Sequence, residues 1–406
     1  MTIPLAAPKS DPAWDLLLVG GGLQNALIAL AVLERRPNAS LALLEASHAI
    51  GGNHTWSFHS ADVPDRARAI IEPLVVQRWA GYDVAFPGFE RQLSDAYSAI
   101  SSERLRAVVS ERLLAAPNAV ALTGAHASEV TGHSVTLSNG TRLTGRLVID
   151  ARGPRRFAHP DTHAAPARPR ARGAVGYQKF LGLELEIEPQ QSTARSVPLL
   201  MDATVPQTDG LRFFYVLPFS ATRVLVEDTY FSDSASMDAP ELRAQILAYA
   251  DRAGLVVRAV VREEQGVLPL PTRRAAPPRA ESPLLAGYAG GWFHPATGYS
   301  FPAALRLALH IAEAPFDEVF GSAWLQLTRE HDKQFAFGAL LNRLLFGAFS
   351  PADRWHALAR FYRLPEGVIR RFYSLNTTST DRMRLLCGRP PSGLSLRAVL
   401  SRGNLA

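Results

Sequence analysis

The sequence predicts an α/β fold in which a domain with a parallel sheet is interrupted by a mainly antiparallel sheet and followed by helices. Two observations support this prediction. A strand, a glycine-rich turn and a helix follow one another near the N-terminus and again from residue 284, whereas residues 176–270 alternate strand-like runs with turns. With 406 residues, 47% of them hydrophobic, the chain is long enough for two domains with a sizeable core.

The first strand-turn-helix unit occupies residues 15–45. The pattern predicts a strand at Asp15–Val19, a turn at residues 20–22, a helix at Leu23–Leu33 and a second strand at Leu41–Glu45. This order is typical of a dinucleotide-binding unit, in which the N-terminus of the helix faces a pyrophosphate. Residues 16–33 are apolar enough to resemble a membrane span, but three consecutive glycines followed by Gln24 and Asn25 interrupt them.

Several residues of this unit are candidate cofactor ligands. Gly20 and Gly22 match the first two glycines of the G-x-G-x-x-G fingerprint, and Asn25 stands at the third position. Glu45 ends the second strand, where an acid accepts a hydrogen bond from a ribose. The pair Gly51-Gly52 follows, as is typical of flavoproteins, because glycine lets the backbone approach the cofactor. Together these residues predict a dinucleotide site and favour FAD over NAD.

The next elements extend the pattern. We expect a helix at Leu105–Ala115 and a strand at Val120–Leu122. A hairpin around Asn139-Gly140 is expected at Val135–Leu143, and a buried parallel strand is expected from Arg146. The last of these returns beside the first strand. The runs between Gly176 and Leu270 then predict an inserted antiparallel sheet.

From Leu284 the chain resumes the strand-turn-helix pattern of its N-terminal part. A strand and a turn that carries Gly290 and Gly298 precede a helix from about Pro302, whose N-terminus would face the flavin in FAD proteins of this architecture. We therefore divide the chain into a discontinuous FAD-binding domain, a substrate domain and a helical C-terminal region that is a candidate membrane contact. The FAD-binding domain comprises residues 13–155 and 276–315, the substrate domain residues 156–275, and the helical C-terminal region residues 316–406.

The charge of the chain limits the kinds of partner to be expected, and its cysteine content bears on the cellular compartment. The formal net charge is +6, with basic clusters at residues 168–172 and 272–279. Nucleic acid, an anionic membrane surface or a solvated basic face would each explain these clusters, but no nucleic-acid motif accompanies them, so nucleic acid is not an expected partner. Cys387 is the only cysteine, and the first residues lack a secretory signal. Both features suit a cytoplasmic location. No metal site is predicted.

Four separated segments resemble the bacterial lycopene beta-cyclases, flavoproteins that close the ends of a linear carotene into β-ionone rings. These segments are GGNHTWSFH, YVLPFSATRVLVEDTYF, EEQGVLPLP and FHPATGYSFP at residues 51–59, 215–231, 263–271 and 293–302. The similarity extends from Asp15 to about Pro391, and Asn25 in the fingerprint agrees with it.

The resemblance implies a Rossmann-like, glutathione-reductase-like FAD-binding domain and a redox-neutral conversion of lycopene to gamma-carotene and then beta-carotene. It also implies FAD in its reduced form, NADPH as the electron source, and lycopene and related linear carotenes as substrates. Because lycopene is confined to lipid, it further implies peripheral association with a membrane surface. Other enzymes of carotenoid synthesis are candidate partners.

The stretch VLVEDTYF at 224–231 holds the candidate acid. Glu227 and Asp228 interrupt a run of β-formers and, on a strand, point to opposite faces. Taken alone, the stretch favours a strand end at which both acids are solvated or paired. Ring closure, however, requires an acid, a means of stabilising a carbocation, and a base. The resemblance implies that Glu227 faces the substrate as the acid, while Asp228 is structural.

Alternatives remain open at this point. A flavin-dependent monooxygenase or reductase of a prenyl lipid would share the fold, and so would a non-catalytic lipid escort. Gly287-Tyr288 stands where many flavoproteins have Gly-Asp at the ribityl chain, which argues against tight flavin binding. Direct proton transfer from the flavin is an alternative to Glu227.

Two groups of apolar and aromatic residues have two interpretations each. Apolar residues between 335 and 346 predict either a core helix or a membrane-docking surface. Pocket lining and simple packing are equally expected for Trp292, Trp355, His294, Thr297 and Tyr299.

Overall fold

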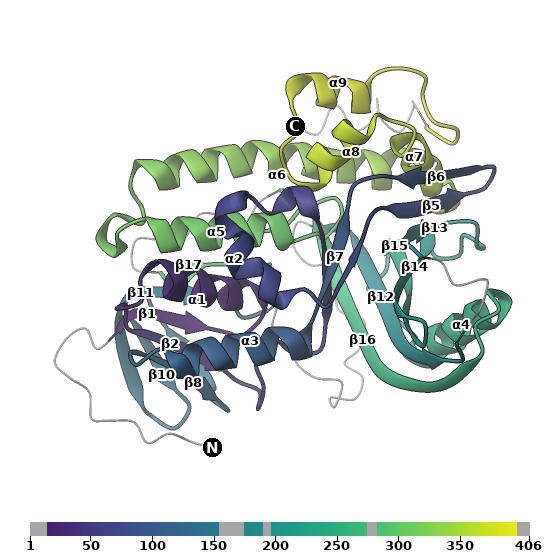
Figure 1. The fold of residues 1–406 in the computed structure, drawn as a ribbon. Coiled ribbons are helices and arrows are strands. Elements are labelled where there is room, and N and C mark those ends of the chain that lie inside the picture. Colours follow the sequence, from purple (N-terminus) through teal and green to yellow (C-terminus); the bar gives the residue numbers. More distant parts are fainter. Residues whose placement is uncertain (1–13, 154–173, 190–195, 274–281, 396–406) are drawn as a thin grey trace.

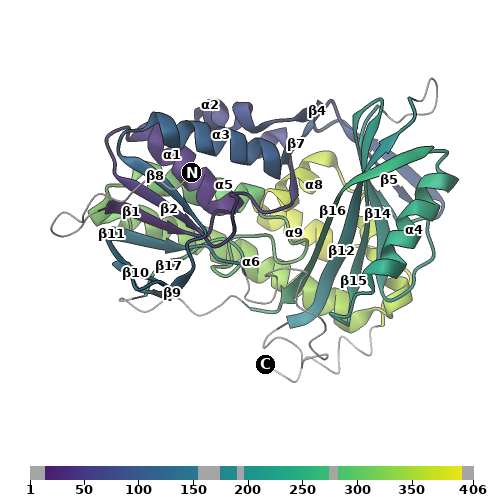
Figure 2. The same ribbon diagram turned by 90° about the horizontal axis from the view of Figure 1, so that it is seen from below.

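The computed structural model describes residues 14–153, 174–189, 196–273 and 282–395. Two large sheets lie beside each other, and the long helix α6 (Ser322–Ala348) runs past both of them (Figure 1). Figure 2 shows the parallel sheet on one side of the molecule and the antiparallel sheet on the other. The predicted α/β fold is confirmed.

The first sheet contains the parallel strands of the predicted nucleotide-binding unit. Its strand order is β8-β2-β1-β11-β10-β9, with β17 paired to β11. The strands are β1 (Trp14–Val19), β2 (Leu41–Glu45), β8 (Ala119–Thr123), β9 (Ala127–Val130), β10 (Ser134–Leu137), β11 (Arg142–Asp150) and β17 (Leu284–Leu285). The predicted hairpin strand and the predicted buried strand are one element, β11, which pairs antiparallel with β10 and parallel with β1.

Three helices accompany this sheet, and all were predicted. They are α1 (Leu23–Arg35), α3 (Ser102–Ala115) and α5 (Phe301–Glu313). Helix α1 is almost wholly buried because it packs against both α5 and α3. This burial explains why its sequence is apolar enough to resemble a membrane span.

The second sheet has the order β16-β12-β15-β14-β13-β5-β6. Its strands are β5 (Tyr82–Phe86), β6 (Phe89–Leu93), β12 (Ala174–Ile187), β13 (Leu199–Asp202), β14 (Leu211–Ser220), β15 (Arg223–Ser232) and β16 (Val257–Pro271). All pairs are antiparallel except β13 with β5. Strands β5 and β6 come from residues assigned above to the FAD-binding domain, so the sheet extends beyond residues 156–275. The helix α4 (Ala239–Arg252), which was not predicted, packs on β12 and β15.

A small third sheet and a short helix connect the two larger sheets. The sheet has the order β3-β7-β4, with β3 (Thr55–His59), β4 (Gln77–Trp79) and β7 (Tyr97–Ser101), and the helix is α2 (Arg68–Ile71). Two residues separate strand β3 from the Gly51-Gly52 pair. The strand therefore links the predicted nucleotide-binding turn to the region between the two large sheets.

The C-terminal region is helical, as predicted, with α6 followed by α7 (Arg354–Phe361), α8 (Glu366–Tyr373) and α9 (Ser379–Leu386). Phe335, Phe337 and Phe346 on α6 are buried, so the core interpretation is confirmed for these three side chains. The leucines of the same stretch, Leu340, Leu341, Leu344 and Leu345, are partly exposed, and a membrane contact of this region stays a prediction. No helix in the described part of the chain is long and apolar enough to cross a bilayer. The basic cluster at 168–172 and most of the one at 272–279 lie outside the described residues.

Candidate active site

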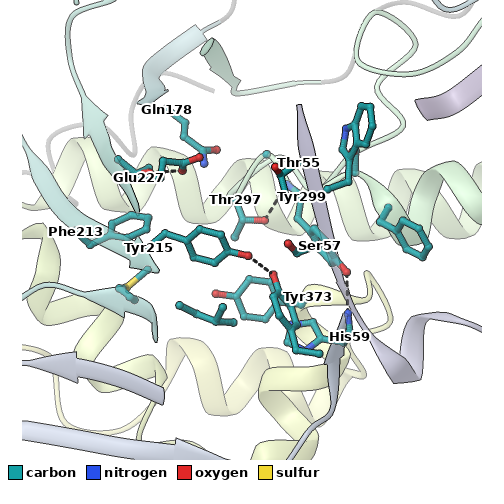
Figure 3. A pocket seen from close by; sticks show the side chains of 18 of the residues that line it. Thr55, Ser57, His59, Gln178, Phe213, Tyr215, Glu227, Thr297, Tyr299 and Tyr373 are labelled. Atoms are coloured by element: carbon teal, nitrogen blue, oxygen red, sulfur yellow. Dashed lines mark hydrogen bonds between the residues drawn. The ribbon is translucent and has the colours of Figure 1, made fainter. Parts of the chain in front are cut away.

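One cavity, of about 250 Å³, lies where the second sheet, strand β3 and the turn before α5 meet (Figure 3). One part of its wall is acidic, another is formed by tyrosines, and the rest is mostly apolar. The residues of these three parts are Glu227 and Glu264; Tyr97, Tyr215, Tyr299, Tyr362 and Tyr373; and Leu200, Met201, Phe213, Leu225, Phe231 and Leu358. Such a cavity suits an apolar ligand on which a few polar groups act.

Glu227 projects from β15 into this cavity. The hydroxyl of Thr229 donates a hydrogen bond of 2.6 Å to its Oε1. Burial, together with the negative charge of Glu264, raises the pKa of Glu227 to about 8, and the bond from Thr229 opposes the rise. The side chain is therefore mainly a neutral carboxylic acid at pH 7, which can donate a proton.

Asp228 points to the opposite face, as the strand alternation predicts. It is fully buried there, and Nε and Nη2 of Arg212 donate hydrogen bonds of 2.9 and 2.7 Å to its two carboxylate oxygens. The hydroxyl of Tyr230 donates a third bond of 3.1 Å. Asp228 does not line the cavity. Its contacts are those of a buried ion pair that holds β14 and β15 together.

Glu264 is a second carboxyl group in the cavity wall, and only 4% of it is exposed. Its Oε2 accepts hydrogen bonds from Nη1 of Arg262 at 3.0 Å and from the backbone N–H of Thr55 at 2.7 Å. Burial outweighs the opposing effects of Arg262 and the Thr55 N–H, so the pKa of Glu264 is raised above its ordinary value. Because Thr55 starts β3, this carboxyl group also joins the second sheet to the chain that leaves the predicted nucleotide-binding turn.

The tyrosine part of the wall surrounds His59, at the other end of the cavity from Glu227 in Figure 3. Tyr215 extends between the two ends, and its hydroxyl lies 3.0 Å from that of Tyr97. The imidazole of His59 lies among several tyrosine rings, and its Nδ1 is 3.3 Å from Oδ2 of Asp95. Burial raises the pKa of Tyr97 and Tyr215, so their phenols stay neutral. Aromatic faces in such a wall attract positive charge.

The predicted nucleotide-binding turn has the expected geometry. Gly20 and Gly51 have φ values of 97° and 90°, which favour glycine, and the N–H of Gly51 donates a bond of 2.9 Å to the carbonyl of Gly21. Gly22 begins α1 without a side-chain cap, and a Cβ at this position would meet nothing within 4 Å. The space beside Gly22, at the N-terminus of α1, is therefore open, as a phosphate site at this position would require.

Glu45 and Asn25 bind the turn itself. The carboxylate of Glu45 accepts bonds of 2.6 Å from the N–H of Gly21 and 2.7 Å from that of Ser47. The amide of Asn25 is fully buried and donates to the carbonyls of Val19 and Gly20 at 3.0 and 2.9 Å. Asn25 thus replaces close helix-to-strand contact with two hydrogen bonds. The side-chain N–H groups of Asn25 are therefore used within the turn.

Of the two glycines predicted before α5, one lines the cavity and the other does not. Gly298 lines the cavity with φ of 71°, and a Cβ there would lie 2.3 Å from Oε1 of Gln178. Gly290 does not line it, and a Cβ there would lie 2.1 Å from the carbonyl oxygen of Leu285. Gly290 therefore permits a tight backbone turn. Tyr288, at the position discussed for an aspartate, stacks on Phe293 at 3.9 Å between ring centroids and donates a hydrogen bond to the carbonyl of Pro269.

The aromatic and polar residues left open by the sequence separate into two groups. Thr297 and Tyr299 line the cavity. His294 is buried against Phe372, and burial lowers its pKa to about 3, so it is a neutral packing residue. Trp292 stacks on His331 outside this cavity, and Trp355 packs at the edge of a hydrophobic cluster.

Sequence reasoning missed Glu264 as a site residue, although it lies in the EEQGVLPLP segment. A signal existed, because this carboxyl group interrupts a strand-like run just as Glu227 does. The tyrosines of the wall come from four separate parts of the chain and show no common spacing. Only the tertiary structure brings them together.

The chain resembles one protein family and several curated proteins over nearly its whole length. The model of the lycopene cyclase protein family matches residues 15–398. The lycopene beta-cyclase of Pantoea ananas is 40% identical over 401 residues, which cover 96% of this chain and 99% of the relative. The lycopene beta-cyclase of Paracoccus sp. is 36% identical, with 96% of this chain and 97% of the relative covered.

Solved structures share the fold at low identity. A geranylgeranyl bacteriochlorophyll reductase-like protein from Thermoplasma acidophilum aligns with a TM-score of 0.60 at 13% identity, covering 97% of this chain and 99% of that protein. A flavin-dependent brominase aligns with a TM-score of 0.63 at 12% identity, covering 97% and 98%. These likenesses agree with the predicted Rossmann-like architecture. From the family model and the curated relatives together, this chain belongs to the lycopene cyclase family.

Proposed function

We propose that the protein is a lycopene beta-cyclase that converts the linear ends of lycopene into β-ionone rings without net oxidation or reduction. The observation that carries this proposal is Glu227, a carboxyl group with a raised pKa in an apolar and aromatic cavity. Protonation of an unactivated alkene requires an acid that is protonated near neutral pH and shielded from water. Glu227 meets the first requirement, and the apolar and aromatic wall of the cavity would limit the water around it.

In the proposed reaction Glu227 donates its proton to carbon 2 of the terminal alkene. The cation left at carbon 1 is attacked by the π electrons of the bond between carbons 5 and 6, which joins carbon 1 to carbon 6 and moves the charge to carbon 5. Loss of the proton on carbon 6 restores the double bond. The faces of Tyr97 and Tyr215 stabilise the positive charge. Leu200, Met201 and Phe213 exclude the water that would capture it.

We propose FAD as the cofactor, because the residues present fit it. The unobstructed N-terminus of α1 at Gly22, the positive φ of Gly20 and Gly51, and the acid at Glu45 together form a dinucleotide cradle. When bound in its reduced form, FAD supplies an electron-rich ring that stabilises a nearby cation electrostatically. NADPH is the proposed source of its electrons. The cradle and the cavity are joined by β3 and by the turn that carries Gly298.

Replacing Glu45 by alanine is expected to weaken FAD binding roughly 10- to 100-fold, because it removes the ribose acceptor and the anchor of the Gly21 N–H. Glu45→Gln keeps one acceptor oxygen and should retain more of the affinity. Fluorescence titration of the apoprotein with FAD measures both. Equal FAD affinity in the wild type and in Glu45→Ala would contradict this assignment.

The rate of ring closure is expected to fall as pH rises through about 8. Glu227 must be protonated to act, and its raised pKa extends the protonated form from the usual value of 4.5 up to about 8. Its titration therefore causes no loss of rate below neutral pH. Initial rates between about pH 6 and pH 10, with the concentration of reduced FAD held constant, measure this decline of the rate at alkaline pH. A rate that stays constant to the alkaline end would rule out a titrating acid with this pKa.

The substrate places a further requirement on the protein. Lycopene is confined to lipid, so we propose peripheral contact with a membrane surface, from which the apolar part of the cavity receives the carotene. Other enzymes of carotenoid synthesis are proposed as neighbours on that surface. The function is tested by anaerobic incubation of lycopene liposomes with the protein, FAD and a chemical reductant, followed by pigment analysis. Gamma- and beta-carotene are expected. Unchanged lycopene, or a hydroxylated or saturated product, would overturn the proposal.

A further inference from the structure

We propose that Glu227 and Glu264 form an asymmetric carboxyl pair that holds one proton, with the charge on Glu264, the proton on Glu227 and Gly182 as the spacer between them. This inference rests on the proposed cyclase function. It adds Glu264 as a positioning residue that keeps the acid protonated.

The register of the second sheet places the three residues in one row. Glu227 on β15 is opposite Gly182 on β12, and Gly182 is opposite Glu264 on β16. Residues opposite each other on neighbouring strands project from the same face of a sheet. Both carboxyl groups therefore point to the cavity, and both line it. Their backbones are two strand spacings apart, about 10 Å.

Gly182 leaves open the space over the middle strand, between the side chains of Glu227 and Glu264. A Cβ at this position would lie 3.2 Å from Cγ of Glu264 and 3.5 Å from Cβ of Glu227. Any larger side chain would occupy the gap between the carboxyl groups. Its backbone is not in the left-handed region, so the glycine is needed here for space and not for backbone conformation.

The partners of the two carboxyl groups determine which one carries the charge. Oε2 of Glu264 accepts bonds from Arg262 and from the N–H of Thr55, and both stabilise a carboxylate. Glu227 accepts one hydroxyl bond, from Thr229. Glu184 shares Arg262 with Glu264 but is also bonded to Arg223, and Asp228 is paired with Arg212 on the far face. The charge therefore resides on Glu264.

This asymmetry explains how one residue acts first as the acid and then as the base. Two neighbouring carboxyl groups resist ionising together, so charged Glu264 keeps the proton on Glu227. When Glu227 gives that proton to carbon 2, the pair becomes doubly negative. Glu227 then takes the proton released from carbon 6, which restores the starting state. One C–H bond forms and one breaks, and no electrons or external protons are needed.

The test is the pH dependence of ring closure in Glu264→Gln. Glutamine retains an acceptor for the Thr55 N–H, and Arg262 keeps its bond of 3.0 Å to Glu184. The alkaline limb, which is the pH range in which the rate of ring closure falls, should move to a pH lower by about one unit or more. At a pH above this range, the variant should therefore be about tenfold slower than the wild type. Below the limb the rate should stay within a few fold of the wild type. Gly182→Ala, which changes no charge, should move the limb in the same direction by pushing the carboxyl groups apart.

Glu184→Gln is the matched control, because it removes a carboxylate from the same arginine at a position that does not line the cavity. Its limb should stay in place. An unmoved limb in Glu264→Gln, or an equal loss of rate at every pH, would overturn the pairing. Both outcomes differ from failure of the proposed function, in which the wild type itself forms no rings.

Discussion

Replacing Glu227 by glutamine is expected to lower the rate of ring closure at least about 10²-fold. Glutamine keeps the shape of the side chain and can still accept the bond from Thr229, but it has no acidic proton to give to carbon 2. FAD binding should be unchanged, because Glu227 lies on the second sheet, away from the turn at Gly20. Pigment analysis of anaerobic reactions measures the rate, and FAD titration confirms that the variant is intact.

The stability of Glu227→Gln provides an internal control. A folded-state pKa raised to about 8 means that the charged form is disfavoured by burial, so Glu227 contributes less stability as pH rises from 4.5 through about 8. The neutral amide does not titrate, so this variant should be at least as stable as the wild type at alkaline pH. A variant that is well folded and forms rings at the wild-type rate would contradict the role of Glu227 as the acid and favour proton transfer from the flavin.

Replacing the adjacent Asp228 by asparagine is expected to lower the free energy of unfolding by about 3–5 kcal/mol. Arg212 is only 5% exposed, and Asp228 supplies the carboxylate that neutralises it. Asparagine would leave a buried cation without its counter-charge. Urea denaturation measures the loss, while the rate per folded molecule should change little because Asp228 faces away from the cavity.

A double variant separates the ion pair from other effects at this position. Arg212→Met combined with Asp228→Leu removes both charges, and its loss of stability should be smaller than that of Asp228→Asn. If Asp228→Asn is as stable as the wild type, the pair does not hold β14 to β15. If it is stable but inactive, Asp228 acts on the chemistry.

The local parts of this site could be predicted from the sequence. The opposite orientations of Glu227 and Asp228 follow from the period of two in any strand, and the turn at Gly20 follows from a contiguous pattern. The helix α4 was within reach as well. Its Asp238 cap accepts a hydrogen bond from the N–H of Glu241, a start signal that the surrounding strands obscured.

The non-local parts could not be predicted in the same way. The parallel pairing of β5 with β13 joins segments more than 100 residues apart, and no local pattern encodes it. The pairing of Glu227 with Glu264 depends on the register of both with β12. The buried stripe of α6 has the composition of a membrane-docking face, and only its packing shows that it is core. The domain boundaries proposed from the sequence remain a prediction.

The most direct test of the central claim is the isotope content of gamma-carotene formed in a single turnover in heavy water. The enzyme is used in excess over lycopene, with FAD reduced and the exchangeable protons replaced beforehand. Proton-initiated, redox-neutral ring closure predicts one deuterium at carbon 2 of the new ring and no oxidation of NADPH in proportion to product. A ring without deuterium at carbon 2, or one NADPH oxidised for each ring, would contradict it.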